Sequence, residues 1–405
     1  MTVMPGSDNE AGALALFSAK PAFNETLHVG RPNIGNREEF HRQIDGILDR
    51  RWLTNNGECV QELEARLASL LGVKHCIAMC NATVALEITI RALGLKGEVI
   101  VPSFTFVATP HSLQWQEITP VFCDIDPLTH NIDPRCVEKL LTPRTTGIIG
   151  VHLWGRPCDV EALSEIAQKH NLKLMFDAAH AFNCTRGGRM VGGFGNAEVF
   201  SFHATKFFNT LEGGAVATND DDLAQQIRLM KNFGFAGYDN VVYIGTNGKM
   251  NEVSAAFGLV GLENLDQFVA VNRANYQVYR QGLAGVPGIS LIAYEEGERN
   301  NYQYIVCEVD HASAGISRDA LMEVLHAENV VARRYFYPGC HRMEPYRSYF
   351  PHAGLLLPHT EALTQRVLLL PTGTAVGPGE IEKICRIIKL AVEHAPEVMR
   401  KVTTG

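Results

Sequence analysis

The pattern of apolar and polar positions predicts alternating strands and helices through the first two thirds of the chain. Short apolar runs have the length of buried strands, and residues 83–93, 157–169 and 220–232 show the spacing of amphipathic helices. Strands alternating with helices predict an α/β fold with a seven-stranded, mainly parallel sheet that is covered on both faces. The predicted strands are residues 74–79, 98–101, 120–124, 147–152, 172–177, 197–202 and 215–218.

The pattern changes on either side of this region. Two helices are predicted before it, over residues 38–51 and up to Gly72, and residues 1–35 read as an irregular, loosely ordered arm. Beyond about residue 265 the pattern gives a long helix, a strand at 302–309 and helices at 318–328 and 379–394. We therefore predict an arm over 1–35, a large domain over 36–265 and a smaller α+β domain over 266–405.

Composition narrows the class of protein. The 405 residues are 46% hydrophobic and 20% charged, which is typical of a soluble globular protein, and no segment is predicted to span a membrane. The net charge of −8 argues against nucleic acid as a partner. The ten cysteines are scattered and contain no CxxC pair, which favours reduced thiols and a cytoplasmic location.

Lys206 is the first candidate for chemistry. It lies in Ser201-Phe-His-Ala-Thr-Lys206-Phe-Phe-Asn-Thr-Leu-Glu212-Gly-Gly214, between two predicted core strands. A lysine in a loop is most often a solvated surface residue. Partial burial lowers the pKa of an ammonium group, however, and frees the amine to form a Schiff base. Its position makes Lys206 a candidate amine nucleophile.

Two further groups are predicted at the same edge of the sheet. Asp177 ends an apolar strand, where a carboxylate needs a cation nearby, although a helix N-cap is the ordinary alternative. In Cys80-Asn-Ala-Thr-Val-Ala85 a strand passes into a helix whose free N–H groups, with the Thr83 hydroxyl, could hold a phosphate. Such helix starts are also common without any ligand.

Together these groups match the requirements of pyridoxal 5'-phosphate. The lysine forms the Schiff base, and the aspartate keeps the pyridine nitrogen protonated, so that the ring can accept electrons. Ser201 is a further candidate phosphate ligand. Phe106, in Pro102-Ser-Phe-Thr-Phe106, could cover one face of the ring, although an aromatic residue after a strand is more often part of the core.

From about Trp52 to its C-terminus the chain resembles the DegT/StrS-type sugar aminotransferases, which are pyridoxal phosphate enzymes of the aspartate aminotransferase fold. Each shared motif is weak alone, but their order and spacing are specific. The motifs are Trp52-Leu-Thr, Asn81-Ala-Thr-Val-Ala-Leu86, Pro102-Ser-Phe-Thr-Phe106, Val151-His-Leu-Trp-Gly155, Asp177-Ala-Ala-His180, Ser201-Phe-His-Ala-Thr-Lys206, Glu212-Gly-Gly214 and Asn247-Gly-Lys-Met250.

The resemblance implies roles for these residues. Lys206 would link to the cofactor and move the proton between substrate and cofactor, Asp177 would pair with the pyridine nitrogen, and Phe106 would stack on the ring. His180 would lie beside the 3-oxygen of the ring, although a core or solvated histidine is nearly as plausible from the residues alone.

The resemblance also implies a phosphate site shared between subunits. The N–H groups of Ala82 and Thr83 and the Ser201 hydroxyl would hold the phosphate, and Asn247 of a neighbouring subunit would complete the site. An obligate homodimer follows from this arrangement. Ala82 stands where the family usually has glycine, and Lys249 replaces a commoner arginine, which exchanges a planar fork for a point charge.

A C-terminal stretch resembles the family's loop at the substrate entrance. Val331-Ala-Arg-Arg-Tyr-Phe-Tyr-Pro338 and the following Cys340-His-Arg342 offer groups suited to a nucleotide-linked sugar, or they pack the small domain. Its form is most similar to members that act at C4 of a dTDP-linked 4-keto-6-deoxyhexose. The candidate substrate contacts are Lys249, Arg333, Tyr335, Tyr337 and His341.

These expectations combine into one hypothesis. The chain would be an aminotransferase that moves an amino group from L-glutamate to a nucleotide-linked keto sugar. An aminotransferase that acts on a keto-inositol is the alternative within enzymes, and a non-catalytic regulator on the same fold is the alternative outside them. Lys206 argues against relatives that replace this lysine with histidine and dehydrate sugars.

Overall fold

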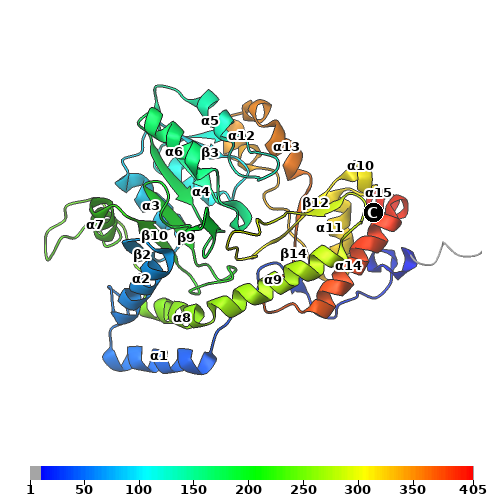
Figure 1. Ribbon diagram of the computed structural model, residues 1–405, viewed down its shortest axis with the longest axis horizontal. Coiled ribbons are helices and arrows are strands. Elements are labelled where there is room, and N and C mark those ends of the chain that lie inside the picture. The colour runs from blue at the N-terminus through cyan, green and yellow to red at the C-terminus, as the bar shows by residue number, and fades with distance from the viewer. Residues whose placement is uncertain (1–10, 405) are drawn as a thin grey trace, which may run out of the picture.

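The central feature of the computed structural model, which describes residues 11–404, is a seven-stranded sheet (Figure 1). Its strand order is β2-β10-β9-β6-β5-β3-β4, and β10 runs in the direction opposite to the other six strands. The predicted fold is thereby confirmed. The strands are β2 (His75–Met79), β3 (Glu98–Pro102), β4 (Thr119–Cys123), β5 (Thr145–Val151), β6 (Lys173–Asp177), β9 (Ala197–Ser201) and β10 (Gly214–Thr218).

Helices cover both faces of this sheet. Successive residues of a strand enter opposite apolar clusters, with Phe176 and Phe200 on one face and Met175 and Val199 on the other. The first face packs against α2 (Glu58–Leu71), α5 (Pro134–Leu140) and α6 (Val160–Lys169), and the second against α3 (Ala82–Ala92) and α7 (Asp221–Met230). α4 (Ala108–Gln114) and α5 are absent from the sequence prediction because seven-residue helices show little periodicity.

A second, smaller sheet follows in the chain. β11 (Ile289–Leu291), β12 (Ile305–Val309) and β14 (Val367–Leu370) form three antiparallel strands. The long helix α9 (Leu265–Gly282) runs from α8 (Glu252–Glu263), beside the large sheet, to α14 (Pro378–Glu393) (Figure 1). β12 begins three residues later than the predicted strand, so Tyr304 precedes it. The domain boundaries at residues 35 and 265 stay predictions.

The arm is more ordered, in its described part, than the sequence suggests. Leu14, Phe23 and Leu27 are buried in the apolar cluster of the smaller sheet. β1 (Leu27–His28) pairs in parallel with β13 (Val330–Val331), and the Glu328 carboxylate accepts 2.7 Å hydrogen bonds from the N–H groups of Ala15 and Ala22. The prediction of a loosely ordered arm is therefore wrong from residue 14 to residue 28, and residues 1–10 lie outside the described residues.

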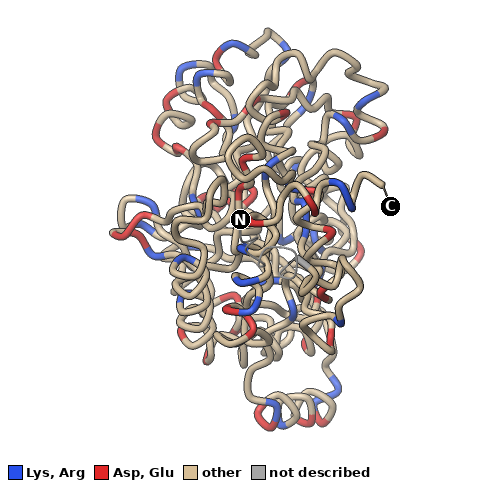
Figure 2. The backbone as a smooth tube through the Cα atoms, turned by 90° about the vertical axis from the view of Figure 1, so that its right-hand side faces the viewer, with Lys and Arg blue, Asp and Glu red and all other residues tan. Residues whose placement is uncertain are grey.

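Surface charge and thiols complete the description. Basic and acidic residues are interspersed around the molecule in Figure 2. All ten cysteines are free thiols. Within residues 11–404 there is no helix with the length and apolar character needed to cross a membrane.

Candidate active site

A cavity of about 320 Å³ lies at the edge of the large sheet where β2, β3, β6 and β9 end. This is the edge at which parallel sheets bind ligands. The turn around Lys206 closes the cavity together with Tyr304, which directly precedes β12, and with Tyr335 and Phe336. It brings together eight of the residues singled out above: Ala82, Thr83, Phe106, Asp177, His180, Ser201, Lys206 and Tyr335.

The first turn of α3 forms one wall. Asn81 caps the helix, and its side chain accepts a 2.9 Å hydrogen bond from the N–H of Val84. The N–H groups of Ala82 and Thr83 lie at the first helical positions, where no intrahelical acceptor exists. Gly214 lets the helix start lie against β10, since a Cβ atom there would come within 2.7 Å of the Ala82 nitrogen. This turn fits the phosphate of the predicted cofactor.

Asp177 ends β6 and is buried. Its carboxylate accepts hydrogen bonds from the Thr109 hydroxyl at 2.8 Å and from the N–H of Ala179 at 3.0 Å. Burial raises the pKa of Asp177, and these bonds and the nearby Lys206 oppose the rise. A buried carboxylate held by two neutral donors fits a protonated pyridine nitrogen, which would supply the missing positive charge.

Lys206 lies in the turn after β9, half buried. Its Nζ donates a 2.9 Å hydrogen bond to the Tyr304 hydroxyl. Burial lowers the pKa of Lys206 to about 8, although the Asp177 carboxylate acts in the opposite direction. Lys206 is therefore far more often neutral near pH 7 than an exposed lysine, as a nucleophilic amine requires.

Another part of the cavity wall is made of aromatic rings. The His180 ring lies 4.4 Å from the Tyr304 ring and 5.4 Å from the Trp154 ring, and Trp154 stacks on Phe336 at 5.4 Å. Burial holds the pKa of His180 well below its usual range, so the ring is neutral. The structure thus places His180 in the aromatic core and on the cavity at once. Phe106 lines the cavity with 60% of its surface exposed.

Sequence reasoning assigned no role to Tyr304 or Trp154. Trp154 occurs in one of the motifs quoted above, which was the available signal for it. Tyr304 carries no such signal, because it belongs to none of the quoted motifs and reaches the cavity from the segment just before β12.

The remaining predicted residues lie outside this cavity. Lys249 lines a separate cavity of about 260 Å³, with its ammonium group 4.6 Å from the centre of the Phe233 ring. Asn247, like Lys249, lies in the connection between α7 and α8, and its carbonyl oxygen is 3.9 Å from the Cys80 sulfur. Within the described single chain, neither residue contributes to the wall around Lys206.

The predicted substrate contacts of the C-terminal stretch separate into two groups. Arg333, Tyr335 and Tyr337 line an adjoining cavity of about 440 Å³, which shares Phe106 and Tyr335 with the first. His341 is buried away from both, where Nδ1 lies 2.7 Å from the Ser103 hydroxyl and Nε2 lies 2.7 Å from the Glu361 carboxylate. In this chain His341 joins two segments and does not line the cavity.

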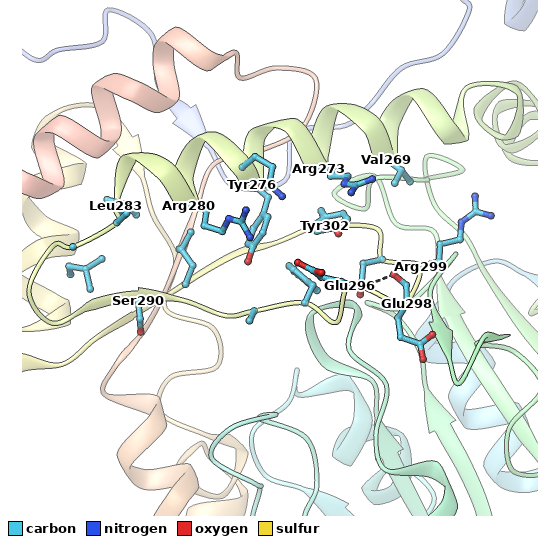
Figure 3. A pocket seen from close by; sticks show the side chains of 18 residues that line it. Val269, Arg273, Tyr276, Arg280, Leu283, Ser290, Glu296, Glu298, Arg299 and Tyr302 are labelled. Atoms are coloured by element: carbon cyan, nitrogen blue, oxygen red, sulfur yellow. Dashed lines mark hydrogen bonds between the residues drawn. The ribbon is translucent and has the colours of Figure 1, made fainter.

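A larger cavity of about 1030 Å³ lies between α9 and the segment around β11 (Figure 3). Arg273, Arg280 and Tyr276 line it, and it contains none of the predicted site residues. One of its residues nevertheless contacts the site: the Tyr294 hydroxyl shares its one proton between the carbonyl oxygens of Trp154 at 3.1 Å and Tyr304 at 3.2 Å.

Comparisons with known proteins agree with this geometry. Residues 35–389 match the DegT/DnrJ/EryC1/StrS aminotransferase family. A dTDP-4-amino-4,6-dideoxy-D-glucose transaminase of Shigella dysenteriae is 42% identical over 77% of this chain and 85% of its own. One of Escherichia coli with the same name is 36% identical over 90% and 98%. The crystal structure of DesI, determined in the presence of its TDP-sugar product, is 49% identical, with a TM-score of 0.93 over 97% of this chain and 99% of DesI.

Proposed function

The chain belongs to the DegT/DnrJ/EryC1/StrS aminotransferase family and is a pyridoxal 5'-phosphate-dependent aminotransferase, and we propose that it transfers an amino group from L-glutamate to C4 of a dTDP-linked 4-keto-6-deoxyhexose. The assignment of the cofactor site rests on one observation. Lys206, whose pKa is lowered to about 8, lines the same cavity as the buried Asp177 and the first turn of α3.

In this proposal different residues of the cavity bind different parts of the cofactor. The N–H groups of Ala82 and Thr83 and the Ser201 hydroxyl bind its phosphate. Asp177 keeps its ring nitrogen protonated, and Lys206 supplies the covalent link. Phe106 and His180 lie against the ring. When bound, the cofactor withdraws electrons from the carbon that carries the reacting nitrogen, which makes the proton on that carbon acidic.

Lys206 is the proton carrier of the reaction. Its Nζ, once free of the cofactor, accepts the proton from Cα of glutamate, and in the second half-reaction it gives a proton to C4 of the sugar. With a pKa of about 8, roughly one tenth of the Lys206 side chains are neutral at pH 7 before any ligand binds.

The sugar substrate is supported by the relatives and by the adjoining cavity. Two relatives carry names that specify a 4-amino-4,6-dideoxyglucose linked to dTDP. The cavity lined by Arg333, Tyr335 and Tyr337 opens next to Phe106 and offers a guanidinium for a diphosphate and rings for a base. We assign the nucleotide to this cavity, with Lys249 of a second subunit as a further cation, and we assign His341 no direct contact.

A homodimer completes the proposal. Exposed apolar side chains cluster in the connection that carries Asn247, which suits an interface with a second copy better than contact with water. Asn247 of that copy would then reach the phosphate site. The free thiols agree with a cytoplasmic location. The exposed side chains are Phe233, Phe235, Tyr238, Val241, Val242, Tyr243 and Ile244.

The visible spectrum of the purified protein with pyridoxal 5'-phosphate tests the proposal. We expect an absorption band that L-glutamate bleaches and that a dTDP-linked 4-keto-6-deoxyhexose restores. The Lys206→Ala variant should form no such band while keeping its circular dichroism spectrum. Restoration by a keto-inositol would identify an aminocyclitol substrate instead, and a wild-type spectrum equal to that of Lys206→Ala would refute the cofactor assignment of this site.

A further inference from the structure

The Tyr304 hydroxyl is fixed in front of Lys206. Tyr304 directly precedes β12, its side chain is almost entirely buried, and its hydroxyl lies 2.9 Å from Nζ of Lys206. The ring is held between two others, with His180 at 4.4 Å and Trp154 at 5.4 Å. Its main chain is contacted as well, because the Tyr294 hydroxyl shares its proton between the carbonyl oxygens of Tyr304 and Trp154.

The hydrogen bond of the Tyr304 hydroxyl goes to the Lys206 amine. Among residues 11–404, Lys206 Nζ is the one hydrogen-bond partner of the Tyr304 hydroxyl. Burial raises the pKa of Tyr304, so the phenol stays protonated at neutral pH. A protonated phenol can accept a hydrogen bond from the ammonium form of Lys206 or donate one to the neutral form. It can therefore hold the amine in either state.

The other groups around Lys206 cannot do this. Among residues 11–404, Lys206 Nζ makes no hydrogen bond to Asp177, Tyr335 or His180. Asp177 affects the amine through its charge, and His180 is a neutral ring. A lysine side chain has four rotatable bonds and loses rotamer freedom when it is fixed. A directional partner is needed for the amine to stay in one place, and the structure offers Tyr304.

We propose that Tyr304 is a positioning residue for Lys206: its hydroxyl holds the amine in the cavity whenever the amine is not bonded to the cofactor. This inference rests on the proposed function, because a transaminase releases its lysine from the cofactor in each half-reaction. The held amine is ready to accept the substrate proton and later to return to the cofactor.

The Tyr304→Phe variant tests the role in cofactor-free protein. Pyridoxal 5'-phosphate is mixed with the protein in a stopped-flow instrument at pH 6 to 10, and the rate at which the visible band forms reports the neutral fraction of Lys206. For the wild type we expect the rate to rise with pH and level off with a midpoint near 8. An ammonium is a stronger donor than an amine, so loss of the acceptor should lower the midpoint by about one pH unit.

At high pH, Tyr304→Phe should also form the visible band more slowly than the wild type. Above the midpoint every Lys206 is neutral, so the plateau depends on how the amine is oriented. We expect the plateau to fall several-fold in Tyr304→Phe. The matched control is Tyr279→Phe, which removes another buried tyrosine hydroxyl. Tyr279 lies on α9 and outside the cavity, and its hydroxyl donates a 2.9 Å hydrogen bond to the Pro371 carbonyl oxygen.

The outcomes separate this role from simple stabilisation. If Tyr304→Phe and Tyr279→Phe lower the melting temperature alike and both keep the wild-type midpoint and plateau, Tyr304 is structural and the positioning role is wrong. If the wild type forms a band that Lys206→Ala lacks, the proposed function survives that result. If the wild type and Lys206→Ala form no band, the cofactor assignment fails and the positioning role falls with it.

Discussion

Lys206 and Asp177 acquire their properties from burial acting on opposite charges. Removal from water lowers the pKa of the ammonium and raises that of the carboxyl group, and each charge partly offsets the shift of the other. Neither shift requires a special residue nearby, since both follow from burying a charged side chain, at the end of β6 for Asp177 and in the turn after β9 for Lys206. A buried charge in that position reduces stability, which is typical of functional sites.

Asp177→Asn should separate cofactor binding from turnover. The amide has the shape of the carboxyl group, and both neighbours of Asp177, now at 2.8 and 3.0 Å, can keep a hydrogen bond to it. The amide oxygen can accept from the N–H of Ala179, and the amide NH2 can donate to the Thr109 hydroxyl oxygen. The amide cannot keep a ring nitrogen protonated. We expect the variant to bind pyridoxal 5'-phosphate and to lose roughly 10²-fold or more in kcat. Unchanged kinetics, measured beside a cofactor titration, would remove Asp177 from the mechanism.

The lowered pKa of Lys206 also predicts a pH dependence of stability. Below pH 8 Lys206 is protonated in the native and the unfolded state, and its burial lowers the free energy of unfolding by the full amount. Between about 8 and the ordinary value of 10.5 the unfolded chain binds the extra proton, so the free energy of unfolding rises with pH. The total rise amounts to as much as about 3 kcal/mol.

Comparison with Lys206→Met, which cannot titrate, isolates this effect. Urea unfolding of both cofactor-free proteins should give a stability difference that is constant from pH 6 to 7.5. The wild type should then gain on the variant up to pH 10.5. A difference that stays flat across the whole range would show that the pKa of Lys206 is not lowered in the folded protein.

At the scale of elements, the site depends on how closely α3 approaches the large sheet. β10 is antiparallel, so its first residue, Gly214, lies at the same edge as the last residues of β6 and β9. A Cβ atom on Gly214 would lie 2.7 Å from the Ala82 nitrogen and 2.8 Å from the Asn81 carbonyl carbon. Both are backbone atoms and cannot rotate away.

Gly214→Ala should therefore displace the start of α3. We expect a loss of about 1–3 kcal/mol in the free energy of unfolding, as for other overpacked sites, and at least about a tenfold weaker affinity for pyridoxal 5'-phosphate. Gly379→Ala is the control, because no atom lies within 4 Å of the Cβ position there. Cofactor titration and urea unfolding of both variants measure the effects, and equal affinities in the two would contradict this account of the helix start.

The sequence predicts elements best where one apolar pattern decides them. All seven strands of the large sheet were found, since each is an apolar run bounded by turns. β14, Val-Leu-Leu-Leu, was not predicted, because a short apolar run also fits a helix. Asp177 and Lys206 could be chosen because they follow predicted strands. Tyr304 could not, because its contact with Lys206 joins residues 98 positions apart across two sheets.

His341 shows a second limit of prediction from sequence, because it was predicted to contact the substrate and does not line the cavity. Its place in a loop near the predicted substrate entrance made it a candidate contact, yet its side chain turns inward to Ser103 and Glu361. Side-chain direction in an irregular segment depends on packing partners that no local pattern specifies. The family resemblance identified the segment, and the packing decides which of its residues reach the cavity.

At the scale of the whole molecule, the proposed sharing of sites between subunits can be tested by mixing. Lys206→Ala removes the amine from its own site, whereas Asn247→Ala weakens cofactor binding in the site of its partner. In a mixed dimer one site then carries both defects and the other is intact. Equal amounts of the two subunits, exchanged at random, should restore about a quarter of the wild-type activity at limiting cofactor.

The two variants assayed separately, each carried through the same exchange, are the controls for this mixture. Activity equal to their average would mean that each subunit builds its own site. Size-exclusion chromatography with light scattering on the same samples establishes whether the exchange produced dimers. A monomeric wild type would contradict the shared site directly.

The cavity around Lys206 draws its wall from segments that run from Asn81 to Phe336. A ribosome must therefore complete most of the chain before the vitamin-derived cofactor has a place to bind. Cofactor binding then raises the stability of the finished fold by mass action. We expect newly made enzyme in vitamin B6-starved cells to be degraded faster than in supplied cells, so nutrient supply would set the amount of this protein as well as its activity.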